Sequence, residues 1–216
     1  MDSLSRVGVL DKAMAVLAAV ESAPQPLAGL VAATGLSRAT AHRLAVALEV
    51  HGLVRRDVEG RFTLGLRLIG LGHAAAEAVP GWLDARPAME WLRSRTGESV
   101  QLFVRDGDER VCVESLEAPH ELRTIVPVGA RLPLDRGSAG RLLRLGAPVG
   151  TPGWVESVAE RQPGVASVSA PVVDPSGRVV AAVSVSGPID RTSRSPGRRY
   201  GAAVAEAAAR VSSHLA

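Results

Sequence analysis

Residues 27–56 read LAGLVAATGLSRATAHRLAVALEVHGLVRR, and this stretch decides how the N-terminal part of the chain folds. Apolar residues at helical spacing predict a first helix over 27–34, which ends next to Gly35. Ser37 is placed to cap a second helix over 38–50. Two helices joined by a short glycine turn are typical of the helix-turn-helix, whose second helix enters a groove of DNA.

A hairpin follows and completes the motif. The segments 53–57 and 61–64 flank a turn at 59–60, so we expect two short paired strands there. An amphipathic helix over 8–22 precedes the two helices. Three helices and a hairpin make a winged helix-turn-helix, which we place in residues 1–65.

The polar face of the second helix and the hairpin carry the candidate DNA contacts. The first residues of such a helix meet base edges, and arginine binds guanine or phosphate with two hydrogen bonds. The sequence does not decide whether each arginine contacts guanine or phosphate. The alternative to DNA binding is an ordinary helical hairpin whose arginines are solvated. Arg55 and Arg56 point to opposite faces of the hairpin, so at most one faces DNA squarely. The candidates are Ser37, Arg38, Ala39, Thr40, His42, Arg43, Arg55, Arg56 and Arg61.

The rest of the chain predicts a linker helix and a second domain. Residues 66–81 read as the linker, and residues 82–216 as a domain that begins with an amphipathic helix over 82–96. The apolar period then changes to two, which predicts an α+β domain with a mostly antiparallel sheet. We expect strands at 99–105, 110–116, 122–128, 167–174 and 179–187, a loop that enters a helix at 137–145, a loop at 146–153, and helices at 154–162 and 196–215.

The composition is that of an ordinary globular protein. The chain has 216 residues, of which 46% are hydrophobic and 22% charged, and this excludes a disordered chain. The net charge is +3, with a small excess of arginine in residues 37–67 that fits a DNA face. A single cysteine, Cys112, cannot form an internal disulfide. No signal peptide or membrane span is visible, so we expect a cytoplasmic protein without a membrane partner.

No catalytic constellation emerges, and we predict neither an enzyme nor a cofactor. The sequence Gly-Ser-Ala-Gly at 137–140 is neither a nucleophile elbow nor a phosphate loop. It is either an anion-binding turn that opens a helix or a purely structural turn. Ser184 and Ser186 share one face of a strand, which suggests a ligand cavity or merely a wet face. The five histidines are scattered without metal spacing, so we predict no metal site.

Both halves of the chain carry short motifs. They are GVLDKA at 8–13, GLS through HRL at 35–44, FTLG at 62–65, LPL with SAG at 132–140, GVASVSAPV at 164–172 and AAVSVSGP at 181–188. These motifs resemble, in order, those of the isocitrate lyase regulator (IclR) family. The resemblance covers nearly the whole chain and is strongest to the actinobacterial branch that controls amino-acid biosynthesis, leucine genes included.

The resemblance implies a C-terminal GAF-like domain that binds a small effector, a carboxylic or amino acid. It also implies a repressor that assembles as a homodimer or homotetramer on palindromic double-stranded DNA operators. The effector site it implies contains Ser138, Ala139, Asp174, Ser184 and Ser186, with the ligand carboxylate at the backbone amides of the first two.

One segment departs from the family pattern. Between Leu145 and Trp154 the family has a longer helical segment that walls the effector pocket, and this chain has GAPVGTPG instead. A second interpretation is therefore a DNA-binding dimer whose C-terminal domain only assembles and binds no effector. A third, an enzyme in the second domain, lacks any catalytic constellation.

Overall fold

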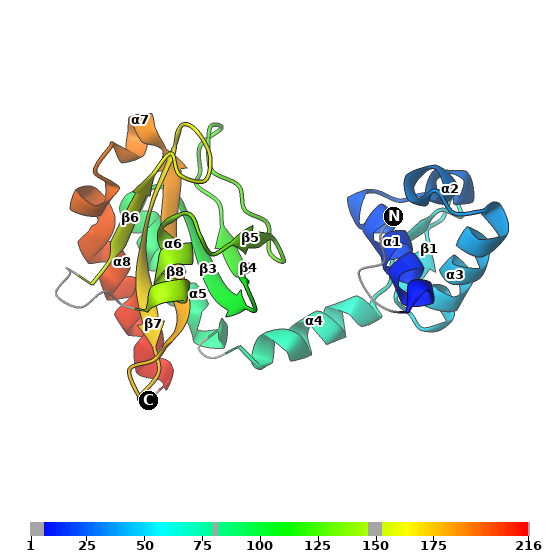
Figure 1. Ribbon diagram of the computed structural model, residues 1–216, viewed down its shortest axis with the longest axis horizontal. Coiled ribbons are helices and arrows are strands. Elements are labelled where there is room, and N and C mark those ends of the chain that lie inside the picture. Colours follow the sequence, from blue (N-terminus) through cyan, green and yellow to red (C-terminus); the bar gives the residue numbers. More distant parts are fainter. Residues whose placement is uncertain (1–6, 80–81, 147–152, 216) are drawn as a thin grey trace. The chain divides into compact units, whose positions relative to one another are not determined.

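The computed structural model describes residues 7–79, 82–146 and 153–215 (Figure 1). The chain divides into two compact units, Met1–Ala75 and Ala76–Ala216. The boundaries at 65 and 81 that the sequence suggests stay a prediction. We describe each unit by itself.

The N-terminal unit is a winged helix-turn-helix, as the sequence predicts. Three helices are followed by a two-stranded antiparallel hairpin in which Val54 lies opposite Leu64. Gly35 adopts the left-handed conformation (φ 68°) and caps the second helix, which makes the tight turn possible. The elements are α1 (Gly8–Ser22), α2 (Leu27–Thr34), α3 (Arg38–Val50), β1 (Val54–Arg56) and β2 (Phe62–Leu64).

One small core holds the helices and the wing together. The buried face of α3 consists of Ala41, Ala45 and Leu48, which pack with residues of α1 and α2. Phe62 of the wing is inserted into the same core and is 1% exposed. Its backbone also exchanges two hydrogen bonds with Gln25, of 2.8 and 2.9 Å. The wing therefore has a fixed place against the helices that position α3.

Gly65, which follows the second wing strand, is hydrogen-bonded to the segment directly after α3. The amide of Gly65 donates to the carbonyl of Leu53 at 2.9 Å. A Cβ at Gly65 would overlap the carbonyl oxygen of Gly52, so no other residue fits without a backbone shift. The helix α4 (Arg67–Glu77) begins directly afterwards, and all of its described residues are at least partly exposed.

The C-terminal unit is an α+β domain built on a six-stranded sheet. The strand order is β5-β4-β3-β8-β7-β6, and every neighbouring pair in the described residues is antiparallel. The strands are β3 (Ser99–Asp106), β4 (Glu109–Leu116), β5 (Arg131–Pro133), β6 (Val155–Val158), β7 (Val165–Val173) and β8 (Val179–Pro188). The helices are α5 (Trp82–Thr96), α6 (Ser138–Leu145), α7 (Ile189–Thr192), α8 (Pro196–Ser212) and the short η1 (Ser213–Leu215).

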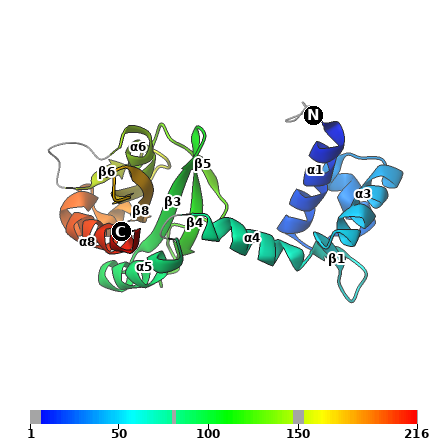
Figure 2. The ribbon, with the colours of Figure 1, turned by 90° about the horizontal axis from the view of Figure 1, so that it is seen from below.

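Helices cover both faces of this sheet (Figure 2). Val183 and Val185 of β8 belong to the large core that includes residues of α5 and α8. Because side chains alternate along a strand, Ala182, Ser184 and Ser186 lie on the opposite face, toward α6. The α6 face is therefore half polar, and it holds the candidate ligand pocket.

The predicted strand at 122–128 is wrong. The structure has irregular backbone there and places the strand at Arg131–Pro133, where it pairs with β4. The apolar residues that suggested a strand, Leu122 and Ile125, are exposed, and Pro127 has no amide hydrogen for a sheet ladder.

The predicted helix at 154–162 is also wrong, because Val155–Val158 forms β6 and pairs with β7. Trp154 fixes the approach of this strand to α8. A Cβ on either Gly197 or Gly201 would overlap the indole of Trp154, so the two glycines form a notch for it. Of the predicted loop at 146–153, residues 147–152 lie outside the described part of the chain.

Candidate DNA-binding surface and effector pocket

Ser37 and Thr40 define the start of α3. The Ser37 hydroxyl accepts a hydrogen bond from the amide of Thr40 at 3.3 Å and donates to its hydroxyl at 2.9 Å. Ser37 is thus a true N-cap, as the sequence predicts. The cap holds the first turn of α3 in place, and Thr40 is half-buried in it.

The exposed face of α3 presents two cations without acidic partners. Arg38, Ala39, His42 and Arg43 are all exposed. Within the described residues, neither Arg38 nor Arg43 forms an ion pair or a side-chain hydrogen bond. Their guanidinium groups are therefore available to a phosphate or a base edge.

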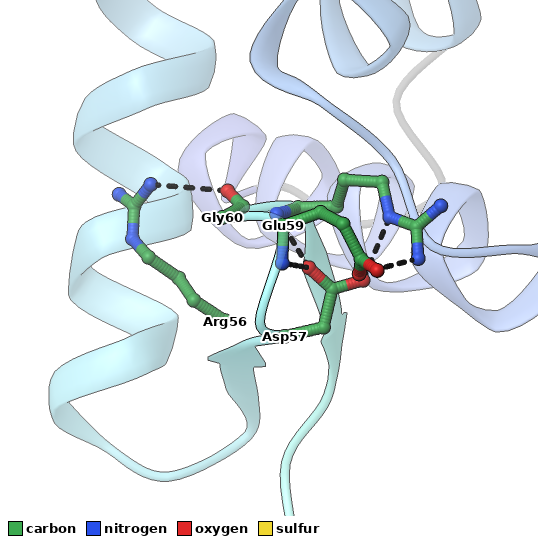
Figure 3. Close-up of polar contacts among 5 residues, drawn as sticks. Arg56, Asp57, Glu59 and Gly60 are labelled. Atoms are coloured by element: carbon green, nitrogen blue, oxygen red, sulfur yellow. Dashed lines mark hydrogen bonds and ion pairs between the residues drawn. The ribbon is translucent and has the colours of Figure 1, made fainter.

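The wing arginines differ from one another in their partners. Arg55 is exposed, and its Nε donates to the carbonyl of Leu64 at 3.3 Å. Arg56 pairs with Glu49 at 3.4 Å and lies 4.2 Å from the ring centroid of Phe62. It also donates to the carbonyl of Gly60 at 3.5 Å (Figure 3). Arg56 thus fastens the wing to α3, while Arg55 keeps its charge without a carboxylate.

Arg61 is neutralised inside the wing turn. It pairs with Asp57 at 2.7 Å and with Glu59 at 2.9 Å. Partial burial of Asp57 opposes its ionisation, but the hydrogen bonds from Arg61 outweigh that effect and lower the pKa of the Asp57 carboxyl. Figure 3 shows Asp57 and Glu59 together on the turn. Arg61 therefore shapes the wing rather than adding net charge to it.

A lysine that the sequence did not single out joins this surface. Lys12 of α1 is exposed and lines a shallow groove with Thr40 and Arg43 of α3. Only the packing of α1 beside α3 places it there, because no spacing in the sequence links position 12 to position 43. Lys12 adds a positive charge next to the arginines of α3.

Four of the five predicted effector residues meet in one pocket. Ser138, Ala139, Ser184 and Ser186 line a recess of about 30 Å³ between the sheet and the N-terminus of α6. One water needs about 10–15 Å³, and small-molecule sites span roughly 300–1,000 Å³, so this recess must widen to admit an effector. The other lining residues are Gln101, Phe103, Arg110, Val126, Leu132, Gly137, Ser157, Arg161, Val165 and Ser167.

A chain of hydroxyl groups forms the polar floor of the pocket. Ser138 Oγ lies 2.8 Å from both Ser167 Oγ and Ser169 Oγ. Ser169 in turn donates to Ser184 Oγ at 2.9 Å. The sheet register places Ser169 opposite Ser184, so the strands themselves align these hydroxyls.

Asp174 does not line this pocket. It lies at the turn between β7 and β8, where its Oδ1 accepts from the hydroxyl of Ser176 at 2.5 Å and from the amide of Arg178 at 3.0 Å. These bonds, that of the Ser176 hydroxyl above all, lower the pKa of the Asp174 carboxyl. In this structure its contacts are those of a residue that stabilises the turn.

Three further pocket residues were missed from the sequence. Gln101 and Arg110 are 1% and 3% exposed, and Arg161 is half-exposed. Burial, followed by the charge of Arg161, lowers the pKa of Arg110 to about 10. A polar residue between Val100 and Leu102 in an apolar strand was the signal that could have revealed Gln101. Arg161 had no such signal.

Two kinds of site receive no support from the described residues. They contain no group of three or more His, Cys, Asp or Glu side chains that could hold a metal ion. Nor do they include a helix that is both long and apolar enough to span a membrane.

The fold and the charged face of α3 define a DNA-binding transcriptional regulator of the winged helix-turn-helix class. The family model for the IclR helix-turn-helix domain matches residues 9–58, and that for the bacterial transcriptional regulator IclR C-terminal domain matches residues 82–146 and 147–213. The chain belongs to the IclR family. This family and the curated relatives are transcriptional regulators, not enzymes.

Three proteins illustrate the similarity. The chain is 36% identical to the HTH-type transcriptional regulator KipR of Bacillus subtilis over 53% of its own length but only 46% of KipR. It is 28% identical to the glycerol operon regulatory protein of Streptomyces griseus over 88% of both chains. An IclR homologue from Microbacterium hydrocarbonoxydans, crystallised with 4-hydroxybenzoate, superposes with a TM-score of 0.79 at 22% identity, covering 96% of this chain and 98% of that one.

Proposed function

We propose that this protein is a repressor in the cytoplasm whose binding to a palindromic operator is controlled by a small acid. The observation that carries the DNA-binding part is the exposed face of α3, where Arg38 and Arg43 have no acidic partner among the described residues. The α3 helix would enter the major groove with its capped N-terminus first. Arg55 of the wing and Lys12 of α1 would add phosphate contacts.

The remaining candidates would serve DNA binding in two ways. Ser37 is the N-cap of α3, and Ala39, Thr40 and His42 lie in its first turns, where side chains approach base edges and phosphates. Arg56 and Arg61 support the wing through their ion pairs. We expect that support to matter for the shape of the wing more than for direct contact with DNA.

The effector would bind in the pocket beneath α6. Its carboxylate would meet the backbone amides of Ser138 and Ala139 at the positive end of that helix. Binding there would shift the equilibrium between conformations that differ in operator affinity. The unpartnered buried donors of the pocket favour this interpretation over a domain that only assembles.

Apolar residues on two helices support assembly as a homodimer, which could pair further into a tetramer. Leu10 and Met14 of α1 are 54% and 56% exposed, and Ile69 of α4 is 70% exposed. Exposed apolar residues that form a contiguous patch mark protein contacts, and we propose that these residues contribute to such a patch. A dimer would present two α3 helices to the two halves of a palindrome.

The genes under control are proposed from the sequence resemblance. We propose amino-acid biosynthesis genes, leucine genes included, as the targets. Chromatin immunoprecipitation with sequencing tests this directly. Recovery of a carbon-source operon alone would contradict the proposed pathway and leave the DNA-binding function intact.

Operator binding tests the proposed DNA surface. Selection from random duplex DNA supplies an operator, and fluorescence anisotropy measures its affinity. Arg43→Ala should lower the affinity by about tenfold or more, because a good base or phosphate contact is worth roughly 1–3 kcal/mol. The melting temperature should not fall, because Arg43 is exposed and unpaired within the described chain.

Arg61→Ala is the matched control, since Arg61 is neutralised by Asp57 and Glu59. It should lower the affinity less than Arg43→Ala. Unchanged operator affinity in Arg43→Ala at physiological salt would contradict the assignment of α3.

A thermal-shift screen tests the effector. Amino acids, keto acids and 4-hydroxybenzoate are added to the full chain, and a ligand of the native state should raise its melting temperature. The absence of any shift, together with intact operator binding, would favour the assembly-only interpretation.

A further inference from the structure

The pocket beneath α6 contains buried hydrogen-bond donors that have no acceptor. The Oε1 of Gln101 accepts from Ser186 Oγ at 2.9 Å, which leaves its Nε2 directed away from that bond and without a partner. The Nε of Arg110 is also buried and unpartnered, although its Nη1 donates to the carbonyls of Pro133 and Arg136. Buried donors without acceptors cost free energy, so an acceptor-rich ligand would relieve both.

The same pocket holds two positive charges and no negative one. Arg110 and Arg161 both line it, and no Asp or Glu is found among its described lining residues. The nearest carboxylates are already engaged. Glu160 accepts from the amide of Gly137 at 3.0 Å and pairs with Arg141 at 3.3 Å, and Asp135 pairs with Arg136 at 3.1 Å. Burial first, and then repulsion from Arg161, lowers the pKa of Arg110, and Asp135 only partly opposes this shift.

The helix α6 adds to this positive field. Arg110 packs directly against its first turn, where a Cβ on Gly140 would overlap the guanidinium. A helix N-terminus is itself positive, so a guanidinium beside it is unfavourable. Glu160 already compensates part of this charge by accepting from the Gly137 amide at the N-cap, and a ligand anion beside Arg110 would compensate the rest. The hydroxyls of Ser138 and Ser184 are occupied with other serines and contribute no charge.

We propose that the effector is a compact organic di-acid. This inference rests on the proposed effector function and narrows its chemistry. One carboxylate lies at the N-terminus of α6 beside Arg110, and Arg161 neutralises the second. Gln101 Nε2 donates to a ligand oxygen. A single carboxylate would leave one of the two arginines uncompensated in a partly dry site.

Isothermal titration of the full chain with succinate and butyrate tests this proposal. The two acids have equal carbon number and differ by one carboxylate. Succinate should bind at least about tenfold more tightly than butyrate, since a charge-assisted contact is among the strong hydrogen bonds. Arg161→Met should remove that preference, because it deletes the charge and keeps most of the side-chain stem.

Two controls separate this loss from a structural effect. Arg131→Met removes an arginine from the same sheet that is exposed and paired with Asp106 and Glu109, and it should keep the preference for succinate. The ligand-free melting temperature of Arg161→Met should match or exceed that of the wild type, since the variant loses an uncompensated charge.

The results that would contradict the di-acid proposal can be distinguished from the result that would contradict the effector function. Butyrate that binds as tightly as succinate would overturn the di-acid assignment and leave the effector function intact. Inorganic phosphate that binds as tightly as succinate, with the same sensitivity to Arg161→Met, would show a site for any anion and would also overturn it. No binding of any acid in the wider screen, with operator binding intact, would overturn the effector function itself.

Discussion

At the residue scale, the arginines of the N-terminal unit fall into two groups, those that pair with a carboxylate and those that do not. Arg38 and Arg43 have no acidic partner in the described chain, whereas Arg56 and Arg61 are paired with Glu49, Asp57 and Glu59. A paired arginine must lose its intramolecular partner before it can bind a phosphate fully. Net charge along the sequence therefore overstates the positive surface available to DNA.

This difference predicts a salt dependence. Each phosphate contact releases counterions, and its loss lowers the slope of log K against log salt by about one. We expect Arg38→Ala to lower the slope if Arg38 contacts phosphate, and to relax base preference at one operator position if it reads a base. Anisotropy titrations from about 50 to 200 mM salt on operator and mutated operators measure both effects. No change in either quantity would exclude Arg38 from the interface.

The wing turn predicts a pH dependence. The pKa of Asp57 is lowered in the folded protein, where hydrogen bonds from Arg61 outweigh the opposing effect of burial. Its contribution to stability is therefore present above the unfolded pKa and is lost as the pH falls through the lower folded value. Asp57→Asn should show faster hydrogen exchange of the amides at 59 and 61 at neutral pH. The wild type should lose the protection of these amides, measured relative to their intrinsic exchange rate at each pH, only in acid.

The amides at positions 59 and 61 are suited to this measurement because both donate to Asp57 Oδ1, at 3.1 and 2.8 Å. Asp174→Asn is the matched control, since it removes a carboxylate of the same kind from the other unit. It should leave wing exchange unchanged. Equal exchange in wild type and Asp57→Asn at neutral pH would contradict the role of Asp57.

At the scale of elements, replacing either of the two α8 glycines that form the notch for Trp154 by alanine should destabilise the protein, contrary to the helix propensities of the two residue types. Alanine is a better helix former than glycine by up to about 1 kcal/mol, so Gly70→Ala in α4, with open space at its Cβ, should stabilise that helix. Gly201→Ala should instead destabilise the C-terminal unit by about 1–3 kcal/mol, because the methyl group would overlap Trp154.

Urea unfolding measures the effect of Gly201→Ala cleanly. All three tryptophans, Trp82, Trp91 and Trp154, belong to the C-terminal unit, so their fluorescence reports on that unit. Circular dichroism follows the helices of both units and serves for Gly70→Ala. A stabilising effect of Gly201→Ala would show that Trp154 can leave the notch without cost.

Elements with a local signal could be predicted from the sequence. The cap at Ser37 and the left-handed Gly35 specify α2 and α3 within a few residues. The strand β6 had no such signal, because its conformation depends on the notch in α8 that receives Trp154. The residues of the pocket could be predicted only in part, again because some of them lack a local signal. Side-chain alternation along a strand predicts that Ser184 and Ser186 share a face, whereas only the folded sheet brings Arg161 into the same pocket.

At the scale of the whole molecule, the proposed dimer would couple two weak DNA contacts. A single winged helix reads only half of a palindrome, and linking two such units raises affinity by an effective concentration rather than by new contacts. The apolar residues exposed on α1 and α4 are the groups we propose for that linkage.

Ile69→Glu tests this linkage. Because Ile69 is 70% exposed in the single chain, the substitution should cost the isolated fold little, within about 0.5 kcal/mol. In a dimer, however, it would bury a charge in an apolar contact. Sedimentation velocity should show a monomer, and affinity for the palindrome should fall by about 100-fold or more, while affinity for a half-site stays unchanged.

Leu145→Glu is the matched control, since Leu145 is also 70% exposed but lies at the end of α6. It should remain dimeric and bind the palindrome normally. A dimer that persists in Ile69→Glu with full operator affinity would show that α4 does not carry the interface. Because half-site affinity depends on the DNA contacts of one winged helix and not on assembly, that result would leave the proposed DNA contacts of Arg38 and Arg43 in place. It would change only the proposed site of assembly.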